Sequence, residues 1–201
     1  MRDSIERPFA SRGGEKLAAA LDAFGVDPAG MVCADLGSNV GGFVDCLLQR
    51  GAAKVYAIDT GYGTLAYRLR KDARVVAMER TNAMHVALPE SIDLVTIDVG
   101  WTRQQHILPG AVRLLKAGGR IITLIKPHYE ADRAKGKRGI LDANAARQVL
   151  EETLERVRAL GLGVTGTVQS PIIGRKGNIE FLALVEACQS PRPKPGVSPA
   201  G

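Results

Sequence analysis

Short apolar runs alternate along the chain with longer amphipathic stretches. The runs are rich in β-branched residues, which is typical of buried strands, whereas the stretches between them show helical spacing of apolar positions. The expected strands cover residues 31–36, 54–59, 74–79, 92–98 and 120–126. The main expected helices between them cover residues 42–50, 64–71 and 105–116. Repetition of strand and helix predicts parallel strands joined by right-handed crossovers.

Two of the expected strands, residues 92–97 and 121–125, are apolar at nearly every position. Helices cover both faces of strands with this pattern, so we expect these two at the centre of the sheet. The clearest helix follows at residues 142–160, where Asp142 can cap the start and Gly161 ends the helix. Its apolar stripe, which should pack on the sheet, consists of Ala146, Val149, Leu150, Leu154, Val157 and Leu160.

Two further strands are expected at residues 163–169 and 178–186, joined by a hairpin-type loop that contains proline and glycine. The last strand should therefore run antiparallel to its neighbours. The pattern predicts an α/β, Rossmann-like domain over residues 1–188, with a seven-stranded, mostly parallel sheet, one antiparallel strand and helices on both faces. Residues 189–201 are proline-rich without apolar periodicity, which predicts a disordered tail.

Composition agrees with one globular domain, since 45% of the 201 residues are hydrophobic. Uninterrupted apolar runs of about 18 residues are absent and residues 1–14 are charged and polar, which disfavours a membrane or secreted protein. The net charge of +6 favours a polyanionic partner, although charge alone is a weak indication.

The potential metal ligands are widely spaced along the chain. The three cysteines form neither a disulfide framework nor a metal-binding cluster, and they suit a reducing cytoplasm. The three histidines also lack the spacing of metal ligands, so we expect no metal. These residues are Cys33, Cys46, Cys188, His85, His106 and His128.

The segment ADLGSNVGGF, residues 34–43, places an acid and a glycine at the end of the first strand and two glycines at the start of the next helix. Such a turn lets a ligand approach the backbone. A dinucleotide site would prefer glycine where Asn39 stands, so the spacing disfavours NAD. The residues expected to form the cofactor turn are Asp35, Gly37, Ser38, Asn39, Gly41, Gly42 and Phe43.

Two more acids, Asp59 and Glu79, end the second and third strands. The carboxylate of Asp59 can accept hydrogen bonds from both hydroxyls of a ribose, and Glu79 can reach an adenine. Alternatively, the glycines only shape a tight turn and Asp59 caps the next helix. Three acids at strand ends along one sheet edge favour a nucleoside-containing cofactor.

The chain resembles the FtsJ-like ribose methyltransferases, and within them the hemolysin-A-like ribosomal RNA methyltransferases. The resemblance spans residues 11–185. It rests on SRGGEKL, DLGSNVGGFVDCLLQRGA, VYAIDTGYGTLAYRLR, VVAMERTN, LIKPHYE and GNIEFLAL. It implies a Rossmann-like S-adenosylmethionine-dependent methyltransferase fold, S-adenosyl-L-methionine as cofactor, and 2'-O-methylation of RNA, with ribosomal RNA or a ribosomal subunit as partner.

The resemblance also implies a catalytic tetrad of Lys16, Asp98, Lys126 and Glu180, with Asp98 also near the cofactor. Taken singly, Lys16 is an ordinary helix residue and Glu180 an outward residue of a strand. Together, in four family motifs, they indicate a site that positions a ribose hydroxyl and accepts its proton.

Lys126 is the expected general base. Its nearness to Lys16 disfavours the charged ammonium, whereas Asp98 opposes this by stabilising it. We expect Asp98 and Lys16 to orient the hydroxyl and the cofactor, and Glu180 to fix a lysine or the ribose.

Two features of the chain depart from the family pattern. The segment DVGWTRQQHIL, residues 98–108, differs from the DVSFISL form often found there, which alters the wall beside the substrate. Members of the closest subgroup also carry an N-terminal S4-type RNA-binding domain, whereas the resemblance here covers the catalytic domain alone. Such a domain is either naturally absent or removed.

RNA contacts are therefore expected from the domain itself. The candidates are the basic residues Arg133, Lys135, Lys137 and Arg138, beside Lys126. Trp101 and Tyr129 can stack on an extruded base, although core packing explains the tryptophan about as well.

Two rival hypotheses remain open at the level of sequence. One is a small-molecule methyltransferase with the same cofactor site, and the other is an RNA-binding or toxin-like protein that retains the fold. A role in lysing cells lacks any amphipathic or apolar membrane segment to support it.

Overall fold

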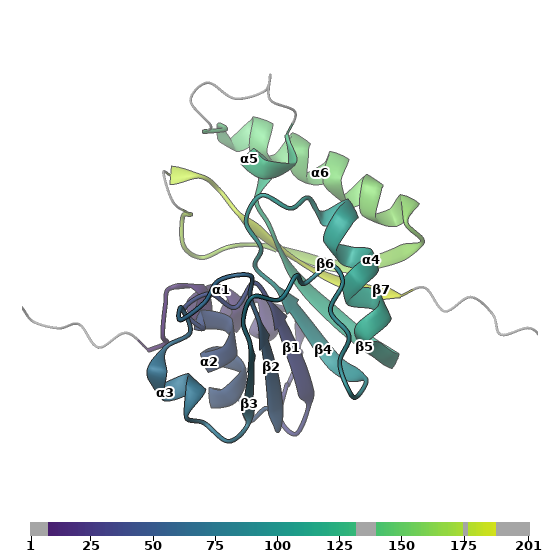
Figure 1. The fold of residues 1–201 in the computed structure, drawn as a ribbon. Coiled ribbons are helices and arrows are strands. Elements are labelled where there is room, and N and C mark those ends of the chain that lie inside the picture. The colour runs from purple at the N-terminus through teal and green to yellow at the C-terminus, as the bar shows by residue number, and fades with distance from the viewer. Residues whose placement is uncertain (1–7, 132–139, 175–176, 188–201) are drawn as a thin grey trace, which may run out of the picture.

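The computed structural model describes residues 8–131, 140–174 and 177–187 (Figure 1). The tail predicted at residues 189–201 lies outside these described residues. So do the basic residues Arg133, Lys135, Lys137 and Arg138.

Within the described residues, seven strands form one sheet in the order β3-β2-β1-β4-β5-β7-β6. The strands are β1 (Val32–Leu36), β2 (Lys54–Ile58), β3 (Val75–Met78), β4 (Ile92–Ile97), β5 (Leu115–Ile125), β6 (Leu162–Gln169) and β7 (Phe181–Ala187). β7 pairs antiparallel with both β5 and β6, and the other pairs are parallel. The predicted mixed sheet, with one antiparallel strand and with β4 and β5 in its interior, is confirmed.

Helices cover both faces of this sheet (Figure 1). On one face α1 (Gly13–Phe24), α2 (Gly42–Gln49) and α3 (Tyr67–Arg70) bury Leu17, Leu47 and Leu69 in a shared core. On the other face α4 (Gln104–Leu114) and α6 (Ala143–Ala159) bury Leu108 and Val149 in a second core. The short helix α5 (Pro127–Glu130) directly follows Lys126. No helix among the described residues is long and apolar enough to cross a bilayer.

The long helix α6 follows the predicted pattern closely. Asp142 caps it by accepting a hydrogen bond of 2.8 Å from the backbone N–H of Ala145. The predicted stripe is buried from Ala146 to Val157. Leu160 was wrongly included in that stripe, because it lies past the end of the helix with 42% of its surface exposed.

Strand register brings the functional ends of five strands to one edge of the sheet. Leu36 at the end of β1 pairs with both Ile58 and Ile97, the last residues of β2 and β4. Across the antiparallel pair, Ile125 at the end of β5 lies opposite Phe181 at the start of β7. Lys126 and Glu180, the residues just beyond that pair, therefore emerge at the same edge.

Candidate active site

A cleft of about 710 Å³ opens at this edge of the sheet. Its walls come from α1, from the segments that follow β1, β2, β3, β4 and β5, and from residues before β7. Most of the predicted site residues line it, namely Lys16, Asp35, Gly37, Ser38, Asn39, Gly42, Phe43, Asp59, Asp98, Lys126 and Glu180. Residues distant in sequence thus form one site.

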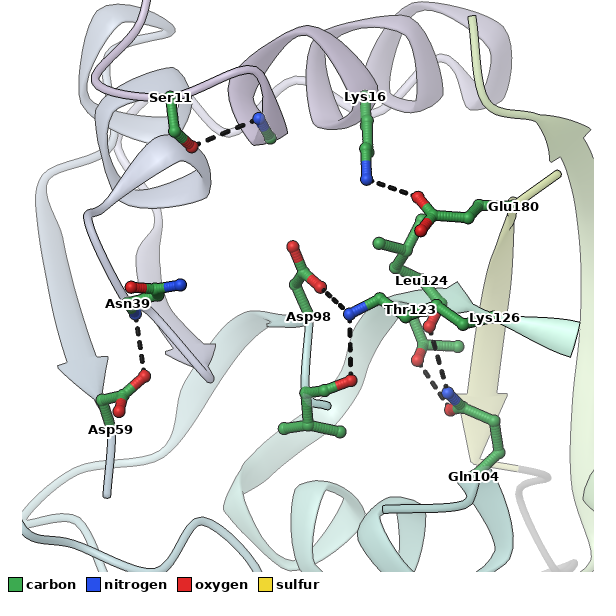
Figure 2. A network of polar contacts seen from close by, with 12 residues as sticks. Ser11, Lys16, Asn39, Asp59, Asp98, Gln104, Thr123, Leu124, Lys126 and Glu180 are labelled. Atoms are coloured by element: carbon green, nitrogen blue, oxygen red, sulfur yellow. Dashed lines mark hydrogen bonds and ion pairs between the residues drawn. The ribbon is translucent and has the colours of Figure 1, made fainter. Parts of the chain in front are cut away.

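The four residues of the predicted tetrad meet in this cleft as two ion pairs (Figure 2). Lys16 on α1 donates a hydrogen bond to the carboxylate of Glu180. The ammonium nitrogen of Lys126 lies 2.5 Å from Oδ1 of Asp98 and 3.1 Å from the carbonyl oxygen of Val99, to which it donates. Each lysine charge is therefore balanced by a carboxylate within the cleft.

A buried polar network supports the strand end that carries Lys126 (Figure 2). The side chain of Gln104 accepts a hydrogen bond of 2.7 Å from the hydroxyl of Thr123 and donates one of 3.2 Å to the carbonyl of Leu124. Its backbone N–H donates to Glu130 at 2.8 Å. Burial raises the pKa of the Glu130 carboxyl, although the Gln104 N–H and nearby cations oppose this. The network ties the start of α4 to the end of β5.

On the opposite side of the cleft, the carboxylate of Asp59 is held by two backbone groups. Its Oδ2 accepts from the N–H of Asn39 at 2.8 Å, and its Oδ1 accepts from the N–H of Gly61 at 2.7 Å. Asn39 itself has a φ of 46°, in the left-handed region that asparagine tolerates better than most residues. Each carboxylate oxygen has a second lone pair, so Asp59 can still accept hydrogen bonds from a ligand.

Asp35 lies at the base of the cleft, almost fully buried. Its Oδ1 accepts a hydrogen bond of 2.7 Å from the hydroxyl of Thr96. Loss of hydration raises the pKa of Asp35 to about 8, with the negative charges of Asp98 and Asp59 adding to the rise and the Thr96 hydroxyl opposing it. Asp35 is therefore largely protonated at neutral pH.

Glu79 and Gly41 do not line the cleft. The carboxylate of Glu79 accepts from the N–H of Gly63 at 3.0 Å and forms an ion pair with Arg70. Gly41 is the N-cap of α2 and packs towards Leu69.

The chain turns just after Glu79, at Arg80, where φ is 51°. This turn brings residues 81–84 into the cleft in place of Glu79. The sequence analysis missed these residues, and the available signal was the threonine and asparagine two and three positions after the expected third strand.

The family model described as FtsJ-like methyltransferase matches residues 9–186. The chain belongs to the FtsJ-like methyltransferase family. This confirms the family predicted from the motifs, and the match covers nearly every described residue of the domain.

Relatives of this chain include YqxC of Bacillus subtilis, named as a candidate rRNA methyltransferase, which is 43% identical over 87% of the chain. The 16S/23S rRNA (cytidine-2'-O)-methyltransferase TlyA of Mycobacterium tuberculosis is 40% identical over 88% of the chain. The chain spans 64% and 68% of the lengths of these two proteins.

A crystal structure of a candidate hemolysin from Lactococcus lactis is also similar to this chain. It superimposes with a TM-score of 0.84 at 38% identity, over 88% of each chain. The hemolysin-like subgroup predicted from the motifs is therefore supported by sequence and by structure.

The cleft of this chain fits a nucleoside cofactor. Gly37 and Gly42 have no side chains to cover their backbone atoms along one wall of the cleft. The Asp59 carboxylate, held by two backbone N–H groups, lines the same cleft. Within the described residues, no three His, Cys, Asp or Glu side chains gather where they could hold a metal ion.

Two aromatic side chains, Trp101 and Tyr129, also line the cleft. Trp101 is 85% exposed, and its ring centroid lies 5.2 Å from that of Tyr129. The alternative that Trp101 serves core packing is wrong, because a core residue would be buried. Its φ of 64° is unusual for a bulky side chain and marks a constrained turn after β4.

Proposed function

We propose that this FtsJ-like methyltransferase transfers a methyl group from S-adenosyl-L-methionine to a ribose 2'-hydroxyl of RNA, with ribosomal RNA as the substrate class. The observation that carries the proposal is the Lys126–Asp98 pair, which lies in one cleft with the Asp59 carboxylate and the Lys16–Glu180 pair. The names of two relatives, YqxC and TlyA, support ribosomal RNA as substrate.

S-adenosyl-L-methionine would lie along the β1 and β2 side of the cleft. Asp59 would accept from its ribose hydroxyls, and the backbone of the turn from Gly37 to Gly42 would contact its polar groups. When bound, the cofactor supplies a methyl group on a positively charged sulfur. Glu79 is left out of this proposal because its carboxylate pairs with Arg70.

Lys126 and Asp98 act on the attacking hydroxyl. Asp98 lies against the side-chain nitrogen of Lys126, and Lys126 must release a proton before its amine can serve as base. The neutral amine then takes the hydroxyl proton as the new O–C bond forms and the C–S bond breaks. The proton remains on the Lys126–Asp98 pair, and Lys16 with Glu180 keeps the far wall of the cleft in position.

RNA would reach the cleft past Trp101, whose exposed ring offers a face on which a base can stack. The basic residues Arg133, Lys135, Lys137 and Arg138, which lie outside the described residues, remain candidates for contact with phosphates. We place the reaction in the cytoplasm, which suits the free, buried thiols of Cys33 and Cys46.

The test is methyl transfer from labelled S-adenosyl-L-methionine to RNA and to ribosomal subunits isolated from cells that lack the protein. Nuclease digestion then reports whether the label lies on ribose or on a base. Label on ribose is the expected result. Label on a base would refute the proposed reaction. Transfer only to small molecules would favour a small-molecule methyltransferase. Cofactor binding without any turnover would favour an RNA-binding or toxin-like protein that merely retains the fold.

A further inference from the structure

A second hollow adjoins the cleft, on the far side of Trp101. This hollow, here called the α4 groove, has a volume of about 630 Å³ and shares Met84, Trp101 and Thr102 with the cleft. Its other lining residues include two arginines and two histidines and no aspartate or glutamate. The four basic residues are His85, Arg103, His106 and Arg113.

One face of α4 forms a wall of the groove. His106, Gly110 and Arg113 follow one another at spacings of four and three residues, so they lie on the same side of the helix, and Arg103 is the N-cap residue just before it. The four residues extend over about 15 Å at the rise of an α-helix. The groove is therefore elongated and runs away from Trp101 along α4.

The loop after β3 forms the opposite wall and packs directly on α4. A Cβ on Gly110 would lie 2.8 Å from the carbonyl oxygen of Met84, so only glycine allows this approach. Arg113 then fixes the loop by donating to the carbonyl of Met84 at 2.9 Å and to that of Pro109 at 3.2 Å. These bonds use two of the five N–H donors of its guanidinium and leave the others for a ligand.

The charge of the groove is set by its arginines, which stay cationic at all relevant pH values. Glu130 lies close enough to Arg103 and His106 to interact with them electrostatically, but it is buried beneath the surface and bound to the N–H of Gln104. Arg113, His85 and His106 are exposed. The groove thus presents positive charge and hydrogen-bond donors to solvent.

We propose that the α4 groove binds the phosphate backbone of the RNA strand next to the target nucleotide. Phosphate is one of the two anionic groups that a guanidinium binds through paired donors, and Trp101 lines both the cleft that would hold the target ribose and the groove beside it. The proposal deepens the proposed function and rests on it for the placing of the target ribose. The groove holds the strand while the cleft performs the chemistry.

The test compares RNA binding by the parent chain with binding by the R103Q/R113Q double variant. The probe is a fluorescent single-stranded oligocytidine RNA of about a dozen nucleotides, titrated at several salt concentrations. Each lost phosphate contact should reduce the slope of log affinity against log salt by about 0.7, so the double variant should lose roughly 1.4. Affinity at low salt should fall roughly tenfold or more.

Two controls separate lost charge from lost structure. R113K keeps the charge but not the forked donors, so its salt slope should match that of the parent. R158Q removes an exposed arginine at the far end of α6, where β6 begins at the opposite edge of the sheet, and should bind like the parent. Melting temperature and S-adenosyl-L-methionine affinity report whether each variant is folded.

An unchanged salt slope in a folded double variant would overturn the groove proposal, as would equal losses in R158Q. Absence of RNA binding by the parent chain would overturn it too. These results are distinct from failure of the proposed function, which is measured by the position of the methyl label and not by binding.

Discussion

Gly37 lies so close to Asp98 that a Cβ on the glycine would be 2.7 Å from the carbonyl oxygen of Asp98. The φ of Gly37 is 89°, which side chains rarely adopt. The backbone N–H of Asp98 also donates to the carbonyl of Leu36 at 3.0 Å. The turn after β1 and the end of β4 that carries Asp98 are therefore packed as one unit.

We expect Gly37→Ala to weaken cofactor binding and methyl transfer together. The positive φ alone costs about 1–2 kcal/mol, and the collision with Asp98 adds to that. Gly118→Ala is the matched control, since Gly118 has a φ of 77° but no atom within 4 Å of its added Cβ. Unfolding and calorimetry on both variants provide the measurement. Equal effects in the two would show that the contact with Asp98 has no role.

Removing one partner of the Lys16–Glu180 pair should destabilise the chain strongly, because both side chains are mostly buried. Removing one partner leaves a buried charge and should lower the free energy of unfolding by about 3 kcal/mol or more. A double-mutant cycle with Lys16→Met and Glu180→Gln tests this, and the double variant should lose less than the two single losses added together. The exposed pair Arg50–Asp22 serves as control and should show little coupling. Strict additivity at Lys16 and Glu180 would contradict the pairing.

Asp59→Ala should weaken S-adenosyl-L-methionine binding by roughly 2–3 kcal/mol, because two hydrogen bonds to a carboxylate are lost. Asp59→Asn keeps one acceptor oxygen for the turn, so its affinity for S-adenosyl-L-methionine should lie between those of the parent and the alanine variant. Glu79→Gln should bind like the parent, since Glu79 lies away from the cleft. Isothermal calorimetry decides, and full affinity in Asp59→Ala would remove this residue from the cofactor site.

Stability should depend on pH through Asp35. Its pKa is raised from 3.8 to about 8 in the folded chain, so between these values the folded chain holds a proton that the unfolded chain releases. Stability from this group is therefore present below about pH 4 and is lost as pH rises towards 8, by up to about 1.4 kcal/mol per unit. Asp35→Asn should reduce the loss of unfolding free energy with rising pH. Urea unfolding measured from roughly pH 5 to pH 8, between the two pKa values, tests this. Parallel pH profiles for parent and variant would show that Asp35 does not titrate in this range.

Lys126→Ala should lower single-turnover methyl transfer by about 10² to 10⁴ while cofactor affinity is largely kept. Lys126→Arg should fail as well, since a guanidinium stays protonated and cannot accept the hydroxyl proton. Lys54→Ala, which changes a lysine at the start of β2 on the opposite edge, should be as active as the parent. Near-normal rates in both Lys126 variants would refute the assignment of the base.

Local pattern was enough to predict most of the fold. The succession of strands along the chain and helix α6 were predicted correctly because burial on one or both faces imposes a period that is visible in the sequence. The start of β5 was predicted wrongly, since the strand begins at Leu115, within the expected helix 105–116 and five residues before the expected strand. The cap at Asp142 follows the same logic, since it depends only on residues one turn away. Leu160 was misplaced because the helix ends before it, and helix ends are less well determined than helix interiors.

The candidate site was predictable only in part. Acids at the ends of parallel strands share an edge of the sheet whatever the details of packing, so Asp35, Asp59 and Asp98 came together as expected. Glu79 did not, because the backbone reverses at Arg80 and turns its side chain towards Arg70. Gln104 gave no sequence signal, since a glutamine at a helix start usually faces solvent.

The sequence by itself therefore determined the strand and helix pattern, the family and the residues available for chemistry. Tertiary structure alone decided that Lys16 pairs with Glu180 and Lys126 with Asp98, and that Gly110 lets the loop after β3 form a basic groove with α4. Lys16 and Glu180 are 164 residues apart. Contacts over such separations depend on strand order and helix packing, which no local period encodes.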